Sequence, residues 1–149
     1  MDELIKQLKF EEGLRLKTYT DPVGVATIGY GHNLTARPYH NGKPIPHEIT
    51  EALAEDLLER DAHYANECLH AAWHGIGLLQ GARHDACVAM VFQLGLDGFM
   101  GFKEMRKQLA VGDWHGAFKS ALDSKWAKQT PNRARRVALQ FITGEYYEA

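Results

Sequence analysis

The stretch from residue 10 to residue 32 restricts the possible folds more than any other part of the chain. Glu12 is followed by Gly13, and glycine commonly lies just past a helix C-terminus. Residues 14–17 then alternate apolar and charged, which is the period of a half-buried strand. A turn at residues 20–24 and a returning strand at residues 25–28 complete the pattern. The stretch therefore predicts a helix end followed by a β-hairpin.

Three side chains with catalytic potential fall on this stretch, namely Glu12 at the helix end, Asp21 in the turn and Thr27 on the returning strand. A carboxyl group at a helix C-terminus meets the negative end of the helix dipole, which favours its protonated form. Asp21, in an exposed polar turn, is expected to ionise, and Thr27 could help it hold a water. Two carboxyl groups in contrasting environments are the usual acid and base of glycoside hydrolysis. Taken alone, however, each feature is more often structural.

The rest of the sequence is mostly helical in pattern. A first helix is expected over residues 2–12, and the Asn41-Gly42 pair signals a second hairpin within a proline-rich segment. A long helix is expected over residues 51–70, with Thr50 as its N-cap and with one apolar and one acidic side.

Further helices are expected in the second half of the chain. After a break at residues 75–77, an apolar helix over residues 79–94 should form a buried centre. A glycine loop at residues 95–101 should follow, and then helices near the ranges 102–109, 113–122 and 131–143. The order of helix, small β-region and then mostly helices predicts an α+β protein.

The composition is that of an ordinary globular protein. The 149 residues and 45% apolar content suit one domain, or two small lobes with a shared core. The two cysteines, Cys68 and Cys87, are expected to be intracellular thiols. No apolar run approaches the roughly 18 residues of a membrane span, and the N-terminus lacks the pattern of a secretory signal.

Charge is distributed unevenly along the chain. Residues 1–100 carry 8 basic and 14 acidic side chains, a net charge of −6, whereas residues 101–149 carry 9 and 5, a net charge of +4. The last third could therefore face an anionic partner, although a solvated helix surface would look the same. No basic stripe interleaved with aromatic residues is present, which argues against nucleic-acid binding.

Three blocks of sequence resemble the phage-type lysozymes, the muramidase endolysins. The first runs from Glu12 to His32, with Tyr19, Asp21, Gly24 and the run Thr27-Ile28-Gly29-Tyr30-Gly31 between them. The second is the block at residues 90–95, and the third begins at Trp126 and continues through residues 129–137. The blocks occur in the family's order and at nearly its spacing, and they cover almost the whole chain.

This resemblance implies roles for particular residues. Glu12 would be the general acid that protonates the glycosidic oxygen, Asp21 would deprotonate the attacking water, and Thr27 would help position that water. The bond cut would be the β-1,4 link between N-acetylmuramic acid and N-acetylglucosamine in peptidoglycan, with inversion. The substrate-binding residues would be Asn33, Phe92, Gln93, Met105, Ser120 and Arg133. The residue types at positions 33 and 105 depart from the family. Arg133 would oppose the dipole by favouring ionised Glu12.

The resemblance also implies the architecture and the setting. A single lysozyme domain over residues 1–149 would comprise a β-lobe at about 13–48, a linking helix at about 51–70 and a helical lobe at about 71–149 packed with the helix at 2–12. His32 and Asp61 would form an ion pair between the β-lobe and the long helix. The protein would be a monomer without cofactor, metal or membrane insertion. It would lyse the host bacterium from its cytoplasm, reaching the wall through a separate holin-type pore.

Several alternatives stay open at this stage. The fold could serve as an inert peptidoglycan-binding module, or the chain could be a lytic transglycosylase, which works with one Glu. A zinc amidase is disfavoured because His70 and His74, although spaced i, i+4, lack the metalloprotease motif. The tryptophans could stack on sugars, although core packing is their commoner role.

The chain also departs from the family in two ways. The segment between residues 32 and 50 is short and proline-rich where close relatives have a small helix, and the net charge of −2 is unusual for an enzyme acting on an anionic wall.

Overall fold

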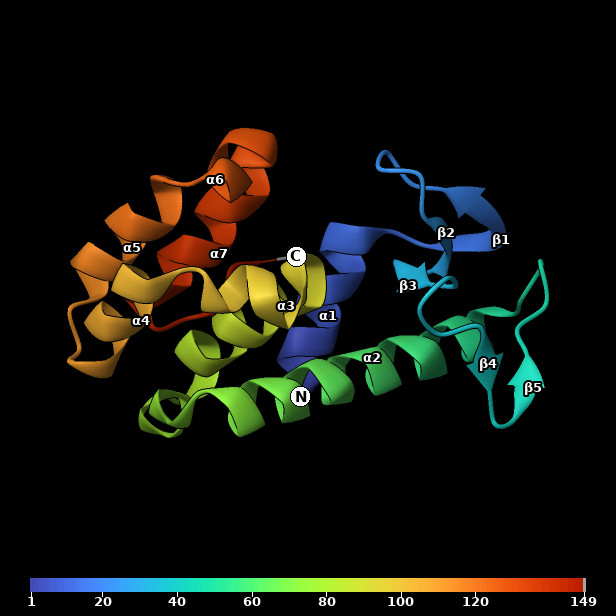
Figure 1. Cartoon of the computed structure of the whole chain (residues 1–149), viewed down its shortest axis with the longest axis horizontal. Coiled ribbons are helices and arrows are strands. Elements are labelled where there is room, and N and C mark those ends of the chain that lie inside the picture. The colour runs from blue at the N-terminus through green and yellow to red at the C-terminus, as the bar shows by residue number, and fades with distance from the viewer. Residues whose placement is uncertain (149) are drawn as a thin grey trace. The chain divides into compact units, whose positions relative to one another are not determined.

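The computed structural model describes residues 1–148, which divide into two compact units with the boundary between His63 and Tyr64. Helices make up most of the chain and small antiparallel sheets lie near its N-terminus, so the α+β lysozyme-like class expected from the sequence is confirmed. The boundary falls inside one continuous helix, α2 (Glu51–Ala72), which therefore contributes residues to both units. Figure 1 shows this helix without a break at the boundary.

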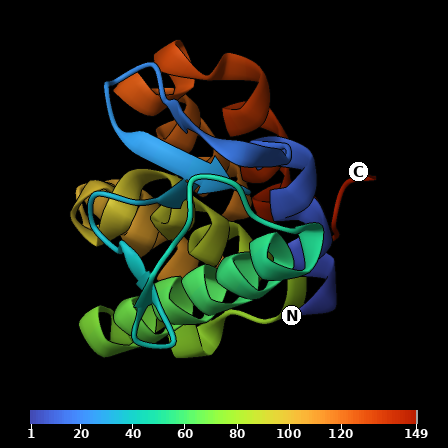
Figure 2. The ribbon, with the colours of Figure 1, turned by 90° about the vertical axis from the view of Figure 1, so that its right-hand side faces the viewer.

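The first unit contains helix α1 (Asp2–Glu12), two small sheets and the beginning of α2. The strands β1 (Arg15–Thr20), β2 (Ala26–Gly29) and β3 (His32–Asn33) form an antiparallel sheet in chain order. The strands β4 (Tyr39–His40) and β5 (Lys43–Pro44) form the second hairpin. Its two turn residues, Asn41 and Gly42, both have positive φ, at 52° and 77°, which confirms the Asn-Gly hairpin. Figure 2 shows this hairpin in front of α2, and His40 of β4 pairs with Asp56 of that helix.

The sheet packs on the first turns of α2. Thr50 caps that helix, since its Oγ1 accepts the backbone N–H of Leu53 at 3.2 Å, as expected. A Cβ built on Gly29 would lie 3.4 Å from the Cβ of Ala54, so the strand and the helix are in van der Waals contact. The Lys9 ammonium of α1 also donates to Glu55 of α2 at 2.6 Å, which raises the pKa of Lys9. These contacts hold α1, the sheet and α2 as one body.

The strand expected after Gly13 forms, but its expected half-buried alternation is wrong. Leu14 and Leu16 are 37% and 39% exposed, and the strand residues of β1 are exposed or half-buried throughout. The fully buried position of this sheet belongs to Ile28 on β2. A three-stranded sheet has one central strand, and that strand supplies its core residue.

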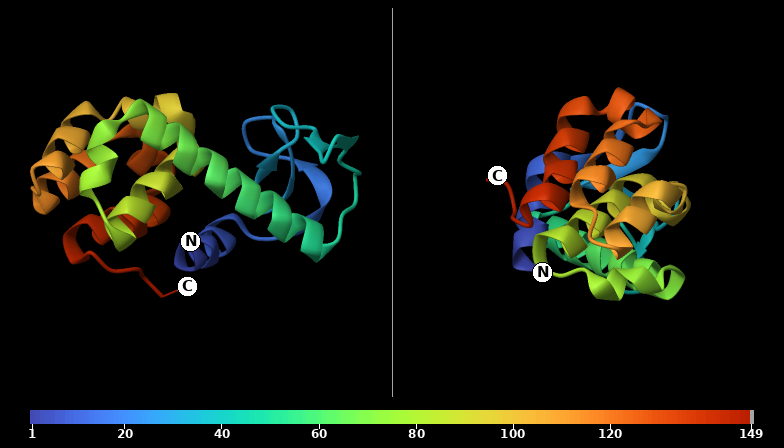
Figure 3. Two further views of the ribbon diagram at one scale, coloured as in Figure 1. Left: turned by 90° about the horizontal axis from the view of Figure 1, so that it is seen from below. Right: turned by 90° about the vertical axis from the view of Figure 1, so that its left-hand side faces the viewer.

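The second unit is helical. After the 3-10 turn η1 (His74–Leu78), where the sequence predicted a break, come α3 (Gly81–Met100), α4 (Lys103–Ala110), α5 (Trp114–Leu122), α6 (Lys125–Gln129) and α7 (Pro131–Thr143). The α3, α5 and α6 helices each contact α7, and α4 contacts α5 (Figure 3). Buried apolar side chains of α3, such as Val88 and Met90, confirm it as the expected buried centre. Both cysteines are free thiols, and burial raises the pKa of Cys87.

The loop predicted at residues 95–101 is wrong over most of its length. Gly95 alone leaves the helical region, with φ 77° and ψ 166°, and the chain returns to helix up to Met100. One glycine with positive φ is sufficient to bend the helix, so the later glycines need not form a loop. The short helix α6 was also not predicted. Its N-cap is Ser124, whose side chain accepts the N–H of Ala127.

Residues 141–146 are hydrogen-bonded to side chains of α3. The last helix ends at Thr143, as predicted, and Gly144 follows it in the left-handed conformation. Arg83 of α3 donates to the carbonyls of Phe141 and Ile142 at 2.9 and 3.2 Å. The hydroxyl of Tyr146 donates to Asp85 at 2.5 Å.

Across residues 1–148, no single helix has the length and apolar content of a membrane span. Only α3 and α4 taken together reach them, and this pair is bent by 105°.

Candidate active site

Glu12 is the last residue of α1, and Gly13 caps the helix by donating its N–H to the carbonyl of Lys9 at 3.0 Å. The Glu12 carboxyl group lies directly against the backbone of Gly31, which has φ +73°. A Cβ built on Gly31 would lie 2.5 Å from Glu12 Oε1 and 3.0 Å from its Cδ. The absence of a Cβ at Gly31 therefore leaves the space that this carboxyl group occupies, a relation that the sequence alone did not reveal.

Asp21 is held by the turn that joins β1 to β2. Its Oδ1 accepts the backbone N–H groups of Val23 at 3.0 Å and Val25 at 2.8 Å. Its own backbone N–H donates to the carbonyl of Val25 at 2.9 Å, which closes the turn. Within residues 1–148 both side-chain hydrogen bonds described for Asp21 fall on Oδ1, so the turn fixes the orientation of the carboxyl group.

Thr27 lies on the central strand, directly opposite Tyr19 of β1 and Asn33 of β3. Residues directly opposite one another in a sheet point to the same face, so these three side chains form one row. Thr27 is 4% exposed, and its hydroxyl donates to the carbonyl of Val25 at 2.9 Å. This bond aims the lone pairs of the hydroxyl oxygen away from the Val25 carbonyl, so the oxygen can accept a hydrogen bond from a water.

The pKa of Tyr19 responds to both carboxyl groups, those of Glu12 and Asp21. Partial burial raises the pKa of its phenol, and the charges of Glu12 and Asp21 raise it further. Arg15 opposes this effect, with its guanidinium carbon 4.5 Å from the centre of the Tyr19 ring. Both carboxyl groups therefore act on the same hydroxyl. Sequence patterns did not predict this effect on Tyr19; the available signal was its place two residues before Asp21.

His32 and Asp61 meet within the first unit. His32 Nδ1 lies 2.7 Å from Asp61 Oδ2, and His32 Nε2 lies 2.7 Å from the carbonyl of Arg37. Both partners are acceptors, so both contacts are hydrogen bonds only when the ring carries hydrogen on both nitrogens, as an imidazolium. Burial alone would lower the pKa of His32, but the Asp61 carboxylate and the Arg37 carbonyl outweigh it and raise that pKa. Arg37 also donates to Asp61 Oδ1 at 2.9 Å.

The remaining residues singled out from the sequence are divided between the units. Asn33 is exposed in the first unit, and its Oδ1 accepts the N–H of Ala36 at 2.9 Å. Half-buried Phe92 and Gln93 lie on α3, and half-buried Arg133 lies in the first turn of α7. Gln93 has an internal connection, because its Oε1 accepts the indole N–H of Trp126 at 2.9 Å.

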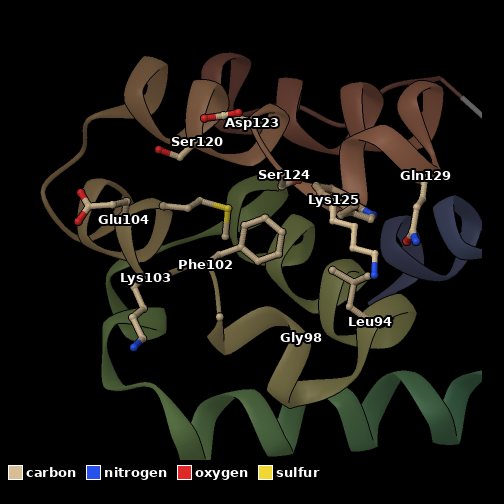
Figure 4. Close-up of a pocket in the computed structure, with 13 residues that line it drawn as sticks. Leu94, Gly98, Phe102, Lys103, Glu104, Ser120, Asp123, Ser124, Lys125 and Gln129 are labelled. Atoms are coloured by element: carbon tan, nitrogen blue, oxygen red, sulfur yellow. The ribbon is translucent and has the colours of Figure 1, made fainter.

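Met105 and Ser120 line a pocket of about 670 Å³ within the second unit. Ser120 Oγ lies 2.7 Å from the side-chain amide of Gln108, whereas Met105 is fully buried in the pocket wall. Apolar and charged side chains share the lining. Figure 4 shows the Phe102 ring in the middle, with Glu104, Ser120 and Asp123 toward one side and Leu94, Lys125 and Gln129 toward the other.

Within residues 1–148, no group of three or more His, Cys, Asp or Glu side chains is placed to hold a metal ion. The structure thus gathers Glu12, Asp21, Thr27 and Asn33 in the first unit. It places the remaining substrate-binding candidates in the second.

Comparison with known proteins gives one family. The phage lysozyme family model matches residues 9–139. The chain is 32% identical to a probable T4-type lysozyme of Dictyostelium discoideum, with 92% of each chain covered. It is 31% identical to an endolysin of Salmonella phage P22, with 93% of this chain and 94% of that protein covered. It is also 32% identical to the pre-baseplate central spike protein Gp5 of Enterobacteria phage T4, but there 95% of this chain spans only 28% of the relative. The chain therefore belongs to the phage lysozyme family.

Proposed function

We propose that this protein hydrolyses the β-1,4 bond between N-acetylmuramic acid and N-acetylglucosamine in bacterial peptidoglycan, by a single displacement with inversion. Glu12 donates a proton to the glycosidic oxygen as the bond from that oxygen to C1 of the muramic acid breaks. Asp21 accepts a proton from the water that attacks C1 from the opposite face, and Thr27 accepts a hydrogen bond from that water. The products are a free reducing end and a free 4-hydroxyl group, so atoms and charge balance.

The observation that carries this proposal is the common environment of the two carboxyl groups. The Glu12 carboxyl group at a helix end and the Asp21 carboxyl group in a turn border the same small sheet, and the charges of both raise the pKa of Tyr19 on that sheet. Two backbone N–H groups hold the Asp21 carboxyl group in one orientation, as suits a base. The Thr27 hydroxyl lies in the row of side chains that begins at Tyr19. A carboxyl pair and a polar anchor for water are the parts that an inverting glycosidase requires.

The second unit supplies the proposed sugar contacts. Phe92 has partly exposed aromatic surface on α3, and Arg133 adds a cation for an anionic wall. Ser120 lies in the lining of the pocket of the second unit, while Met105 shapes its wall. Asn33 of the first unit extends the row that contains Thr27. In this proposal both units belong to one lysozyme domain, which acts as a monomeric endolysin and reaches the wall through a separate pore.

Product analysis distinguishes this reaction from its rivals. Purified peptidoglycan is digested, and the fragments are identified by mass spectrometry. Hydrolysis gives reducing-end muramic acid, a lytic transglycosylase gives the anhydro-sugar, an amidase gives free peptides, and an inert binding module gives no fragments. A proton NMR spectrum recorded early in the digestion should show the α-anomer at the new reducing end, since inversion of a β-linkage produces it. The β-anomer as first product would contradict the single displacement.

Glu12→Gln tests the acid, and the adjacent Glu11→Gln is its matched control. The amide cannot donate the required proton, so we expect clearing of permeabilised Gram-negative cells to slow by about 10²–10⁴-fold. Glu11→Gln removes a carboxyl group from the same helical turn and should stay within a few-fold of the wild type. Circular dichroism melting curves of both variants establish that the fold is retained. Wild-type clearing by Glu12→Gln would overturn the mechanism.

A further inference from the structure

The contact between His70 and His84 has no part in the proposed reaction. His70 lies in the last turn of α2, His84 follows near the start of α3, and both belong to the second unit. Their rings meet at the Nε2 atoms, which are 2.9 Å apart, and the ring planes are inclined by 51°. His70 is exposed and His84 is 21% exposed, so the contact is open to solvent.

The other nitrogen of His84 is held by a carboxylate. Nδ1 of His84 lies 2.8 Å from Asp85 Oδ1, and the second oxygen of Asp85 accepts the Tyr146 hydroxyl at 2.5 Å. A carboxylate accepts hydrogen bonds, so Nδ1 of His84 carries the hydrogen. In the neutral ring the lone pair is then on Nε2, which points at His70. Asp85 thus selects the tautomer in which His84 can bind a metal ion.

This arrangement matches the outer shell of metal-binding histidines. Such histidines usually donate the distal ring N–H to a carboxylate, which fixes the tautomer and increases the basicity of the ligating nitrogen. In the metal-free protein, His70 donates from Nε2 to the lone pair of His84. If His70 instead carries its hydrogen on Nδ1, both Nε2 lone pairs face the gap between the two rings.

The distance suits two ligands of one ion. Two nitrogens bound tetrahedrally to zinc, each at about 2.05 Å, are about 3.3 Å apart. The observed 2.9 Å must therefore open by about 0.4 Å, and the two ring axes, which lie close to the line between the nitrogens, must turn toward a common point beside that line. The exposed His70 side chain can make most of this adjustment. Asp85 supplies negative charge close to the pair. The last turn of α2 adds the partial negative charge of a helix C-terminus, although the start of α3 opposes it.

We propose that Nε2 of His70 and Nε2 of His84 form a binding site for one divalent cation of the zinc, nickel and copper class. Imidazole nitrogen is a preferred ligand for these ions, and water completes the coordination. Asp85 and Tyr146 are positioning residues that hold His84. The ion joins the end of α2 to the start of α3, across η1. It stabilises the fold and takes no part in bond cleavage.

Calorimetric titration of the tag-free full chain with Zn²⁺ tests this site. The titration is run at slightly alkaline pH, because protons compete with metal for imidazole nitrogens. The wild type should bind one Zn²⁺ ion, and its melting temperature should rise with zinc concentration. Both His70→Gln and His84→Gln should lose more affinity than the about tenfold typical for removing a second-shell partner. His63→Gln and His115→Gln, at exposed positions on α2 and α5, are the matched controls and should bind like the wild type.

Two further measurements identify the ligand atoms. Asp85→Asn should keep one ion per chain but lower the affinity by about 10–100-fold. Nitrogen-15 NMR of the imidazoles should show hydrogen on Nδ1 of both rings after zinc is added, with both Nε2 signals shifted. Equal affinity in the wild type and His70→Gln, no binding at all, or imidazole shifts confined to other histidines would overturn the proposal. His70→Gln decides the question even if His84→Gln does not fold, because position 70 is exposed.

Discussion

At the scale of single residues, Gly31 shows how the absence of a side chain leaves room for the carboxyl group of the proposed acid, Glu12. Its φ of +73° lies in the region that favours glycine, and a Cβ at this position would overlap the Glu12 carboxyl group. Gly24, in the turn that holds Asp21, has a similar φ of +88°, but a Cβ there would have no neighbour within 4 Å. The two glycines share the backbone requirement and differ only in the contact with Glu12.

Gly31→Ala and Gly24→Ala therefore separate backbone strain from displacement of the acid. Each variant should lose about 1–2 kcal/mol of unfolding free energy, the cost of an L-residue in the left-handed region. Only Gly31→Ala should also lower kcat on soluble peptidoglycan fragments, because it displaces the Glu12 carboxyl group. Urea denaturation and steady-state kinetics measure the two effects. An unchanged kcat in Gly31→Ala would show that this contact does not position the acid.

Gln93 is another residue for which the structure adds a function to the one expected. The Trp126 indole is 4% exposed, and its N–H donates to the Gln93 amide oxygen at 2.9 Å. Gln93→Ala leaves this buried donor without its partner and should cost about 1–3 kcal/mol of unfolding free energy. Gln93→Glu retains an acceptor and should recover most of that loss. Gln129→Ala, at an exposed position in the same unit, should have little effect in the same denaturation experiment.

At the scale of elements, the His32–Asp61 ion pair joins β3 to α2 within the first unit. The side chains are 4% and 14% exposed. Folding raises the pKa of His32, so the folded state binds the proton more tightly than the unfolded state does. The resulting stability is fully present below the ordinary pKa of 6.5 and is lost as pH rises through the higher pKa of the folded protein.

Asp61→Asn tests this pH dependence. At pH 5.5 the variant should be less stable than the wild type by about 3 kcal/mol or more, since it leaves a buried cation without its partner. The difference should shrink as pH rises above 6.5. Asp56→Asn is the control, because Asp56 pairs with His40 and Arg60 at a site where its own side chain is 43% exposed. Equal stability of wild type and Asp61→Asn at pH 5.5 would contradict the prediction.

Sequence patterns predicted most elements because local rules control where helices and turns begin and end. Thr50 and Asp113 cap their helices with side-chain oxygens, and the Asn41-Gly42 hairpin forms as expected. The errors lie where packing decides between states that are locally similar. Residues 96–100 return to helix after Gly95, and the apolar positions of β1 remain exposed because β2 supplies the buried residue of the sheet.

At the scale of the whole molecule, α2 is the only helix of residues 1–148 that crosses the boundary between the units. The three tryptophans, Trp73, Trp114 and Trp126, all lie beyond that boundary. Tryptophan fluorescence therefore reports the second unit, whereas far-ultraviolet circular dichroism reports both. In the wild type we expect the two unfolding curves to coincide. The helix α2 contributes residues to both units, so when it unfolds both units lose structure together.

His63→Pro should separate the two curves. Proline inside a helix removes one backbone hydrogen bond and clashes with the preceding turn, at a cost of about 3 kcal/mol. His63→Ala, which keeps the helix intact, is the control and should leave the curves superimposed. Coincident curves in His63→Pro would show that the continuity of α2 does not couple the units.

The sequence by itself determined the elements that carry the candidate chemistry. A helix end at Glu12, a turn at Asp21 and a strand at Thr27 all follow from residue types within a few positions of one another. Only the tertiary structure decided which side chains meet. The contacts of Glu12 with Gly31, His32 with Asp61 and His70 with His84 join residues 14 to 29 positions apart. Such contacts depend on how complete elements pack, and no local rule of propensity, capping or turn geometry contains that information.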